Sequence, residues 1–597
     1  MTQVLLSQGQ IEMLRRGRKR IPFKRLGIAA AIALLVFSGC GKSGSSTTTS
    51  PTATAKTTTQ SSTQTTAKTS TAQTTAKATT TLAPTQSSSA PYGTLTILAG
   101  SFGNESFDPV TADVTHAQQL LSPMFDYLSW IVYSGGNRQN VPRLLEKWEM
   151  ASNGLSWTYY VRKGIKFHIG DVVTSKDVKY SLERYMLPQS VRPDLRNAVS
   201  RIDIVDDFTL RLYTKGVQLF MPQMHDPSSP GQGLVMPKDY VDKNGLDYFK
   251  KRPVGTGPWK FVSYTPGYEI QFEAADNHWR QTPAFKNLAV LDVPEEATRI
   301  AMLKTAGADL SDVSLDNAKV LESAGFTSFV TGYIVPVVQL HGVFDPRGTG
   351  MAITDLRVRQ ALAFAIDSQD INKNFFYGKM TSALPPRLTE DSSEIDIPYW
   401  RDYLKKSLRY DPEQAKLLLA QAGYANGLTI RLYSSVIAGA PYITKIAEVV
   451  QSYWAKVGVK AQIVPVEFGT YTSWRSGPAL DLVGQAFVNR NLSGSTLQGL
   501  ANGFLSTGST VLLGKGTTAE SKRFDQLIAS ANTEVDLTKR GALIAEAVKI
   551  CVDSYTMLVI GNVPGVGVMG PRATGTVPAP LPGSAITLFA DVIKHRQ

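Results

Sequence analysis

Few residues of this chain that could act in catalysis or bind a cofactor have the spacing of a known catalytic or cofactor-binding motif. Gly565 to Gly570 has the spacing GxGxxG of a dinucleotide-binding turn, but the next residues, Pro571–Gly575, do not read as the required helix. Gly514–Thr518 contains part of a phosphate-binding loop without its Gly-Lys-Ser/Thr core. The hydrolase motifs HExxH, SxxK and GxSxG do not occur. The sequence therefore argues against nucleotide-dependent enzymes and the common hydrolases.

The histidines give no metal-binding pattern. No two of them have the short spacing that zinc ligands show on a helix or in a turn. The six are His116, His168, His225, His278, His341 and His595. We therefore predict no metal and no cofactor, although residues that are distant in the sequence could meet in the fold.

Strand and helix patterns alternate along the body of the chain, which is typical of an α/β protein. Gly93–Ala99 alternates as a strand, and polar or aromatic residues follow it, where such sheets often place ligand contacts. From this position we predict Asn104, Phe107 and Asp108 as solute contacts. Trp130 is a weaker candidate.

Local signals predict several helices. Asp355–Ile366 can be capped by Asp355, and a second helix opens at Asp411-Pro412 and closes at Gly423. Strand 428–432, helix 443–457 and strand 459–466 form a predicted βαβ unit, which implies a parallel strand pair.

The length of the chain indicates how many lobes it forms, and its charge distribution argues against one class of partner. The chain has 597 residues, so two or more lobes are expected. Its net charge is +13, but residues 1–39 hold seven basic residues and one acidic residue. The remaining charge is mild for so large a body, and its basic residues are scattered. We therefore predict no nucleic-acid binding.

The N-terminal segment predicts export. Basic residues Arg15–Arg25 precede a short apolar run, Leu26–Phe37, and then Ser38, Gly39 and Cys40, the pattern of a secretory signal peptide at residues 1–39. The cleavage region resembles a bacterial lipobox, which implies that Cys40 carries lipid; a plain signal or an uncleaved anchor is the alternative. Cys551 would then have no disulfide partner and is predicted to be buried.

A tether follows the lipid site. Residues 42–90 consist almost wholly of Thr, Ser, Ala, Gln and Lys, without an acidic residue. Such a composition buries too little apolar surface to fold, so residues 40–91 are predicted to be a disordered tether.

A series of phrases in the body resembles the extracellular solute-binding proteins of the oligopeptide/dipeptide/nickel class, family 5. The phrases keep the order and spacing of that family from about Gly93 to Phe589. They are Leu144–Glu149, Asn153–Gly170, Thr174–Val178, Pro253–Phe261, Asp276–Arg280, Val358–Asp367, Tyr410–Pro412 and Ala422–Tyr424. We interpret most of them as scaffold. In Gly255-Thr256-Gly257-Pro258 we expect the glycines to permit positive φ and the proline to stiffen the turn.

The resemblance implies a fold and a division of the chain. The fold is a two-lobed periplasmic-binding-protein type II fold of α/β class, with an extra β-rich subdomain in the first lobe. Lobe I is expected at residues 92–335 with the subdomain at about 138–262, lobe II at 336–548, and a return to lobe I at 549–597. Ligand binding would close the lobes about hinges near residues 330–345 and 545–555.

The resemblance also points to a ligand segment in lobe II. Peptide-binding members carry an aromatic residue and then an aspartate that receives the ligand's ammonium group. Here Phe487 stands at the aromatic position, and Asn489, Arg490 or Asn491 stands in place of the aspartate. These residues suit carboxylate, phosphate or hydroxyl groups better than an ammonium group, unless they are exposed or the correspondence slips. Trp474 is a further candidate contact.

The resemblance therefore predicts a monomeric, exported, lipid-anchored protein that captures a small solute, peptide-like or otherwise polar. It would deliver the solute to the permease subunits of an ABC transporter. Its place would be the outer face of the cytoplasmic membrane or the periplasm, and it would not be an enzyme. A secreted hydrolase and a surface sensor that kept the fold are the alternatives.

Overall fold

A mixed sheet of 11 strands organises the protein, whose structure is a computed structural model. The structure describes residues 90–102, 105–112, 120–134, 137–227, 231–388, 392, 394–435, 437, 440, 442–467, 470–471, 474, 480–492, 496–508, 510–577 and 586–596. These residues belong to one unit, Thr81–Gln597. The predicted signal peptide, Cys40 and nearly all of the tether lie outside the described residues.

The strand order of the large sheet mixes early and late parts of the chain. In spatial order the strands are β14 (Val459–Pro465), β13 (Leu428–Ser434), β15 (Gln485–Leu492), β12 (Thr327–His341), β17 (Val563–Met569), β11 (Leu310–Val313), β1 (Tyr92–Ala99), β10 (Phe285–Asp292), β9 (Glu269–Ala274) and β8 (Trp259–Thr265), with β16 (Met557–Val559) also paired to β12. The GxGxxG spacing falls mostly within β17, a strand that pairs with both β11 and β12.

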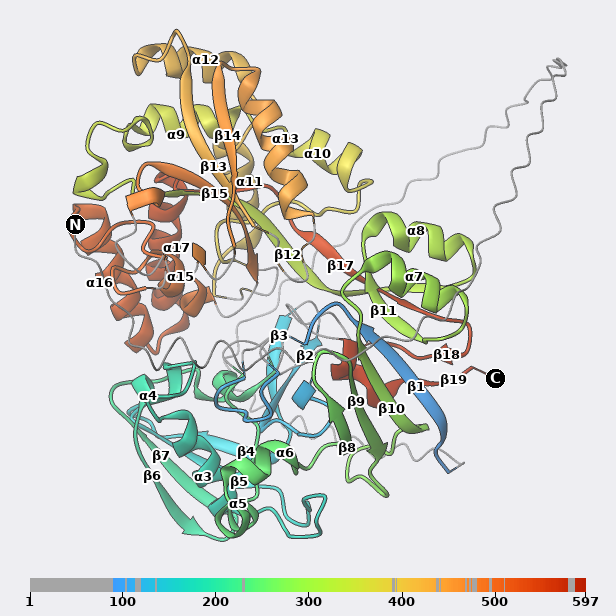
Figure 1. The fold of residues 1–597 in the computed structure, drawn as a ribbon. Helices are drawn as coiled ribbons and strands as arrows, with labels where there is room; N and C mark the ends of the chain where they lie inside the picture. The colour runs from blue at the N-terminus through green and yellow to red at the C-terminus, as the bar shows by residue number, and fades with distance from the viewer. Residues whose placement is uncertain are drawn as a thin grey trace, which may run out of the picture. The chain divides into compact units, whose positions relative to one another are not determined.

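β12 joins two halves of this sheet (Figure 1). Its first part, Thr327–Ile334, pairs with β17, and its second part, Ile334–His341, pairs with β15. We call β8 to β11 with β1 and β17 the first half, and β13 to β16 the second half. The change of partner falls one residue before the lobe boundary predicted at residue 335. The other predicted boundary, at residue 549, falls inside helix α17, and both boundaries stay predictions.

Helices cover both faces of the second half (Figure 1). One face packs against α9 (Leu356–Phe364), α10 (Ser368–Phe375), α12 (Pro412–Gln421) and α13 (Ile443–Ala455). The other packs against α11 (Ile397–Ser407), α15 (Thr496–Phe504), α16 (Ala519–Thr533) and α17 (Leu537–Asp553). β13 and β14 are parallel and joined by α13, which confirms the predicted βαβ unit. Cys551 is a free, buried member of the second of these cores, as predicted.

The first half has its own cores. Helices α7 (Glu296–Lys304) and α8 (Leu315–Ser323) pack with β11 and β17. A larger core joins β1, β8, β9 and β10 to the C-terminal 3₁₀ helix η6 (Ile586–Val592). Four short strands complete this region as two ribbons: β2 (Ser129–Ser134) with β3 (Asn137–Pro142), and β18 (Ala573–Thr574) with β19 (Lys594–His595).

A separate four-stranded antiparallel sheet lies within the range predicted for the β-rich subdomain. Its strands, in spatial order, are β4 (Leu145–Met150), β5 (Ser156–Val161), β7 (Thr209–Thr214) and β6 (Val199–Asp206). Its core includes residues of α3 (Ser175–Tyr185) and α4 (Asp194–Ala198), and α5 (Lys238–Asn244) and α6 (Leu246–Lys251) follow it in the chain.

Local signals in the sequence predicted helix ends well. The side chain of Asp411 accepts a hydrogen bond from the backbone N–H of Gln414 at 3.0 Å and so caps α12. Gly423 ends that helix with a φ of 92°. Asp355 caps α9 in the same way through the N–H of Arg357.

The reason given for the glycines at 255 and 257 was wrong. Neither has a positive φ; the backbone of Met124 instead passes so close that a Cβ on Gly255 would meet its carbonyl oxygen at 2.1 Å. A Cβ on Gly257 would lie 2.5 Å from the carbonyl carbon of Met124. These glycines therefore allow two distant chain segments to approach, and the contact holds Asp126 in place.

Candidate functional site

The predicted ligand segment lies in β15, whose pleat separates its side chains. Phe487, Asn489 and Asn491 share one face of the strand with Gln339 of β12, and Arg490 projects from the other. The two faces belong to different cores, because Ala486 and Val488 pack with α13. The structure therefore brings the phenylalanine and both asparagines together and sets the arginine apart from them.

Phe487 belongs to an aromatic cluster. Its ring stacks on Tyr471 with 3.5 Å between centroids and 8° between planes. Trp474 packs edge-on against Tyr433 at 5.7 Å and is half-buried beside the same cluster. Phe487 itself is fully buried, so Trp474 is the member of the cluster that is more open to a solute.

Asn489 is committed to internal hydrogen bonds. Its amide nitrogen donates to Oε1 of Gln339 at 3.1 Å and to the hydroxyl of Tyr471 at 3.2 Å. Its amide oxygen accepts the backbone N–H of Arg490 at 2.8 Å. The hydroxyl of Tyr471 donates to Gln339 as well, at 2.6 Å. This network positions the aromatic cluster and leaves Asn489 little capacity for a solute.

Asn491 keeps an unused acceptor. Its side chain is buried, its nitrogen lies 2.9 Å from the sulfur of Met557, and its oxygen Oδ1 lacks a hydrogen-bond partner among the described residues. A buried polar atom without a partner is costly. A solute donor at this oxygen would therefore be stabilising.

Arg490 lies near Tyr442, which precedes α13. Burial raises the pKa of the Tyr442 hydroxyl, and the positive charge of Arg490 opposes that rise. Arg490 is half-buried, so its charge is only partly solvated. A guanidinium group has about five N–H donors, so an anionic solute group could contact Arg490 beside the partners that it already has.

The residues predicted after the first strand have other partners. Asn104 lies outside the described residues. Phe107 is buried and packs edge-on against Phe261 at 5.8 Å and Tyr264 at 4.8 Å. Asp108 is buried and pairs with Arg184 at 2.7 Å. Their roles in solute binding stay predictions.

A second polar cluster, in the first half, escaped the sequence analysis. The buried carboxylate of Asp126 accepts hydrogen bonds from Trp279 at 2.9 Å and from His278 at 3.1 Å. Arg143 and Arg280 each approach its other oxygen at 3.3 Å. Nε2 of His278 also faces the carbonyl oxygen of Thr256 at 2.9 Å, so this nitrogen carries the proton.

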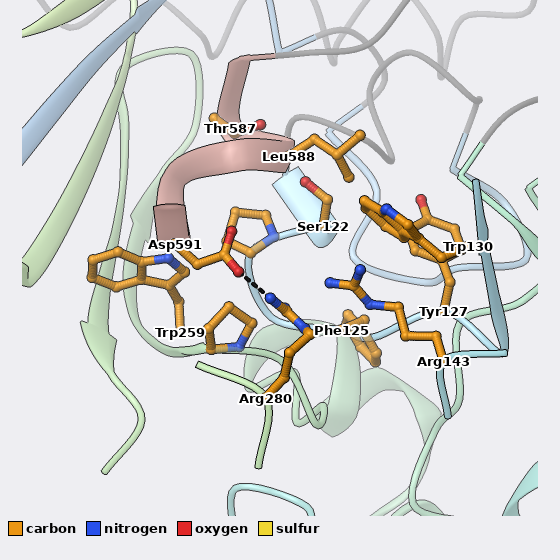
Figure 2. A pocket seen from close by; sticks show the side chains of 12 residues that line it. Ser122, Phe125, Tyr127, Trp130, Arg143, Trp259, Arg280, Thr587, Leu588 and Asp591 are labelled. Atoms are coloured by element: carbon orange, nitrogen blue, oxygen red, sulfur yellow. Dashed lines mark hydrogen bonds and ion pairs between the residues drawn. The ribbon is translucent and has the colours of Figure 1, made fainter. Parts of the chain in front are cut away.

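The two arginines of this cluster line a small pocket (Figure 2). Figure 2 shows Arg280 reaching Asp591 of η6 and Arg143 beneath the ring of Trp130. The enclosed space is about 10 Å³, the room that one water molecule needs, and the pocket with its open mouth is about 250 Å³. Trp130, the weaker candidate of the sequence analysis, therefore does lie at a pocket.

The charges of the cluster shift one another's pKa values. Burial alone would raise the pKa of Asp126, but His278, Arg280 and Arg143 overcome this effect and hold it well below its usual range. Burial, together with the charge of Arg280, lowers the pKa of Arg143 to about 10. Asp126 is thus charged and both guanidinium groups remain protonated at neutral pH.

Neither a cluster of metal ligands nor a helix fit to span a membrane occurs among the described residues. No group of three or more His, Cys, Asp or Glu side chains there could hold a metal ion. None of the helices in the same part of the chain is long and apolar enough to cross a membrane.

The fold and the site agree with one class of protein. Residues 139–501 match the model of a protein family that is described as "Bacterial extracellular solute-binding proteins, family 5 Middle". The match covers more than half of the chain. The protein belongs to the bacterial extracellular solute-binding proteins, family 5, and has the two-lobed type II periplasmic-binding-protein fold of α/β class.

Individual relatives are similar to this chain over most of their length. The chain is 28% identical over 550 residues to heme-binding protein A of Haemophilus influenzae, covering 83% of this chain and 94% of that protein. It is 25% identical over 525 residues to the dipeptide-binding protein of Escherichia coli, covering 81% and 91%. The solved structure of MoaA of A. tumefacien R10 in complex with mannopinic acid has a TM-score of 0.68 at 22% identity, covering 85% and 100%.

Proposed function

We propose that this solute-binding protein captures an acidic or strongly hydrogen-bond-accepting polar solute and delivers it to the permease subunits of an ABC transporter. The family match over residues 139–501 supports solute capture. Membership of a solute-binding family also supports delivery of the solute to a permease. The solute would be released unchanged and not as a reaction product.

The charge of the segment around β15 supports the solute class. This segment offers the cationic side chain of Arg490 where the resemblance to peptide binders predicts a carboxylate, while the open acceptor of Asn491 would receive a hydroxyl or other donor of the same solute. A buried ammonium group without a carboxylate partner costs several kcal/mol. Relatives named for dipeptides and a neighbour solved with mannopinic acid span peptides and an acid. Peptides with a blocked N-terminus and other carboxylates therefore fit this protein better than free peptides.

Replacing Arg490 with alanine should weaken the binding of such solutes by about 30-fold or more, because loss of one partner of a buried charged contact costs about 2–5 kcal/mol. Calorimetry with N-acetyl-trialanine and free trialanine measures this effect. Arg431→Ala is a matched control, since Arg431 lies at the exposed side of the neighbouring strand β13. Tight binding of free trialanine together with a neutral Arg490→Ala would refute the charge argument and leave solute capture standing.

We further propose that Cys40 carries the lipid that anchors the protein on the outside of the cytoplasmic membrane. Cys40→Ala should move the protein almost wholly from the membrane fraction to the soluble fraction or the medium. Immunoblots of the fractions measure this shift. Cys551→Ala is the control, because that cysteine is buried in the core formed with α11, α15, α16 and α17. If both variants stay with the membrane, another element anchors the chain.

A further inference from the structure

The pocket beside Asp126 has more hydrogen-bond donors than its own acceptors can use. Nε of Arg143 donates to Asp126, and its two terminal nitrogens have no hydrogen-bond partner among the residues that the structure describes. Nε of Arg280 is buried without a partner in the same part of the chain. The cluster can therefore accommodate an additional acceptor.

The two carboxylates nearest to the arginines of the pocket, those of Asp126 and Asp591, are already engaged. The two oxygens of Asp126 receive four side-chain donors, from Arg143, Arg280, His278 and Trp279. The carboxylate of Asp591 is paired with Arg280. An incoming group with oxygen acceptors thus meets free N–H groups, whereas an incoming cation would meet carboxylates that are already neutralised.

The guanidinium of Arg143 is held ready for such a group. Its central carbon lies 3.7 Å from the centroid of the Trp130 ring, and its Nε is fixed by Asp126. Only 13% of its side chain is exposed. A stacked and anchored guanidinium loses little conformational entropy on binding, and its outer edge matches the two oxygens of a carboxylate.

The size of the pocket suits one oxygen of that carboxylate. The interior of the pocket, about 10 Å³, has room for one atom of the size of a water oxygen, such as one carboxylate oxygen. The rest of the solute would lie at the open mouth of the pocket. The residues that line the pocket belong to the first half of the protein, whereas Arg490 lies in β15 of the second half, so the two would contact different parts of the solute.

We infer that Arg143, stacked on Trp130 and backed by Arg280, is a carboxylate-binding subsite for the solute. This inference rests on the proposed capture of a solute and assigns one of its recognised groups. Acetate is a small carboxylate probe of such a site. Acetate should raise the Tm of the full-length protein and quench or shift its tryptophan emission, beyond the effect of sodium chloride at equal ionic strength.

Two variants at Arg143 and one control decide the inference. Arg143→Gln should weaken acetate binding by about tenfold or more. Arg143→Lys should also weaken it, because lysine keeps the positive charge beside Asp126 but lacks the paired N–H donors of a guanidinium group. Arg201→Gln is the matched control, since Arg201 likewise stacks on a ring, Tyr213, at 3.6 Å and pairs with Asp203, but lies in the exposed part of β6. It should bind acetate as the wild type does.

Three results would overturn the carboxylate subsite. They are no acetate effect on the wild type, an equal effect on the wild type and both Arg143 variants, and tighter binding of inorganic phosphate than of acetate. Native mass spectrometry of the same preparations separates this failure from failure of solute capture. A solute retained by the wild type, together with any one of these three acetate or phosphate results, would preserve the proposed function while removing the subsite.

Discussion

Replacing Asp126 with asparagine is expected to lower the free energy of unfolding by about 3–5 kcal/mol. The substitution keeps the size of the side chain and removes the charge that Arg143 and Arg280 share. The guanidinium groups of Arg143 and Arg280 would then share a largely buried site in which the one remaining carboxylate is that of Asp591, which pairs with Arg280. The cost of unpaired buried charge, rather than the loss of one hydrogen bond, sets the size of this effect.

Denaturant unfolding of the wild type, Asp126→Asn and a surface control measures it. Asp239→Asn is a suitable control because Asp239 pairs with Lys176 at 2.5 Å while its side chain is 69% exposed. Exposed pairs contribute little, so this variant should unfold almost as the wild type does. Equal stability of Asp126→Asn and the control would show that the cluster is not a structural ion network.

Acidification from pH 6.5 to pH 4 should destabilise the protein by about 3 kcal/mol for each of two histidines, the buried His225 and the half-buried His168. Burial lowers the pKa of His168 to about 4 and that of His225 to about 4. The unfolded chain takes up a proton at each histidine near pH 6.5, whereas the folded protein does so only near pH 4. Stability is therefore full above pH 6.5 and is lost as the pH falls through this window.

The hydrogen bonds of His225 explain why its neutral form is preferred. Its Nδ1 donates to the carbonyl oxygen of Gln232 at 2.9 Å, and its Nε2 lies 2.9 Å from the hydroxyl of Tyr159, which can donate to it. A second proton on the ring would oppose that donation in a site without solvent.

Unfolding curves between pH 7 and pH 4.5 test this account. His225→Gln should be less stable than the wild type at pH 7, but its stability should fall less steeply, by up to about 1.4 kcal/mol per pH unit. His168→Gln should show the same reduction in slope independently. A wild type whose stability is flat over this window would contradict the assignment of both histidines.

Local features of the fold could be predicted from the sequence because their causes are local. Asp411, Pro412 and Gly423 define the ends of α12 through caps and backbone preferences that involve only neighbouring residues. The alternation of β13 and β14 around α13 likewise predicted their parallel pairing. The resemblance to a family supplied the two-lobed arrangement that such signals cannot give.

The polar cluster could not be predicted because its members are far apart in the chain. Arg280 meets Asp126 across 154 positions and Asp591 across 311. The need for glycine at positions 255 and 257 could not be predicted for the same reason, because the backbone that excludes a Cβ there is that of Met124, which is distant in the sequence. No spacing rule connects such segments, and Trp279-Arg280 appeared in the sequence only as part of a family phrase.

The ligand segment was predicted in the right element with an incomplete geometry. The period of two in a strand places Arg490 opposite Asn489 and Asn491, and this alternation could have been read from the sequence. The hydrogen bonds that occupy Asn489 could not, because they depend on Gln339 and Tyr471, from other parts of the chain.

Solute capture itself is tested most directly by native mass spectrometry of the full-length protein, purified from exporting cells without refolding. The account predicts a mass excess that denaturation removes, carried by a small molecule with at least one carboxylate group. Bare protein mass, with no Tm shift from acetate, N-acetyl-trialanine or free trialanine, would contradict it.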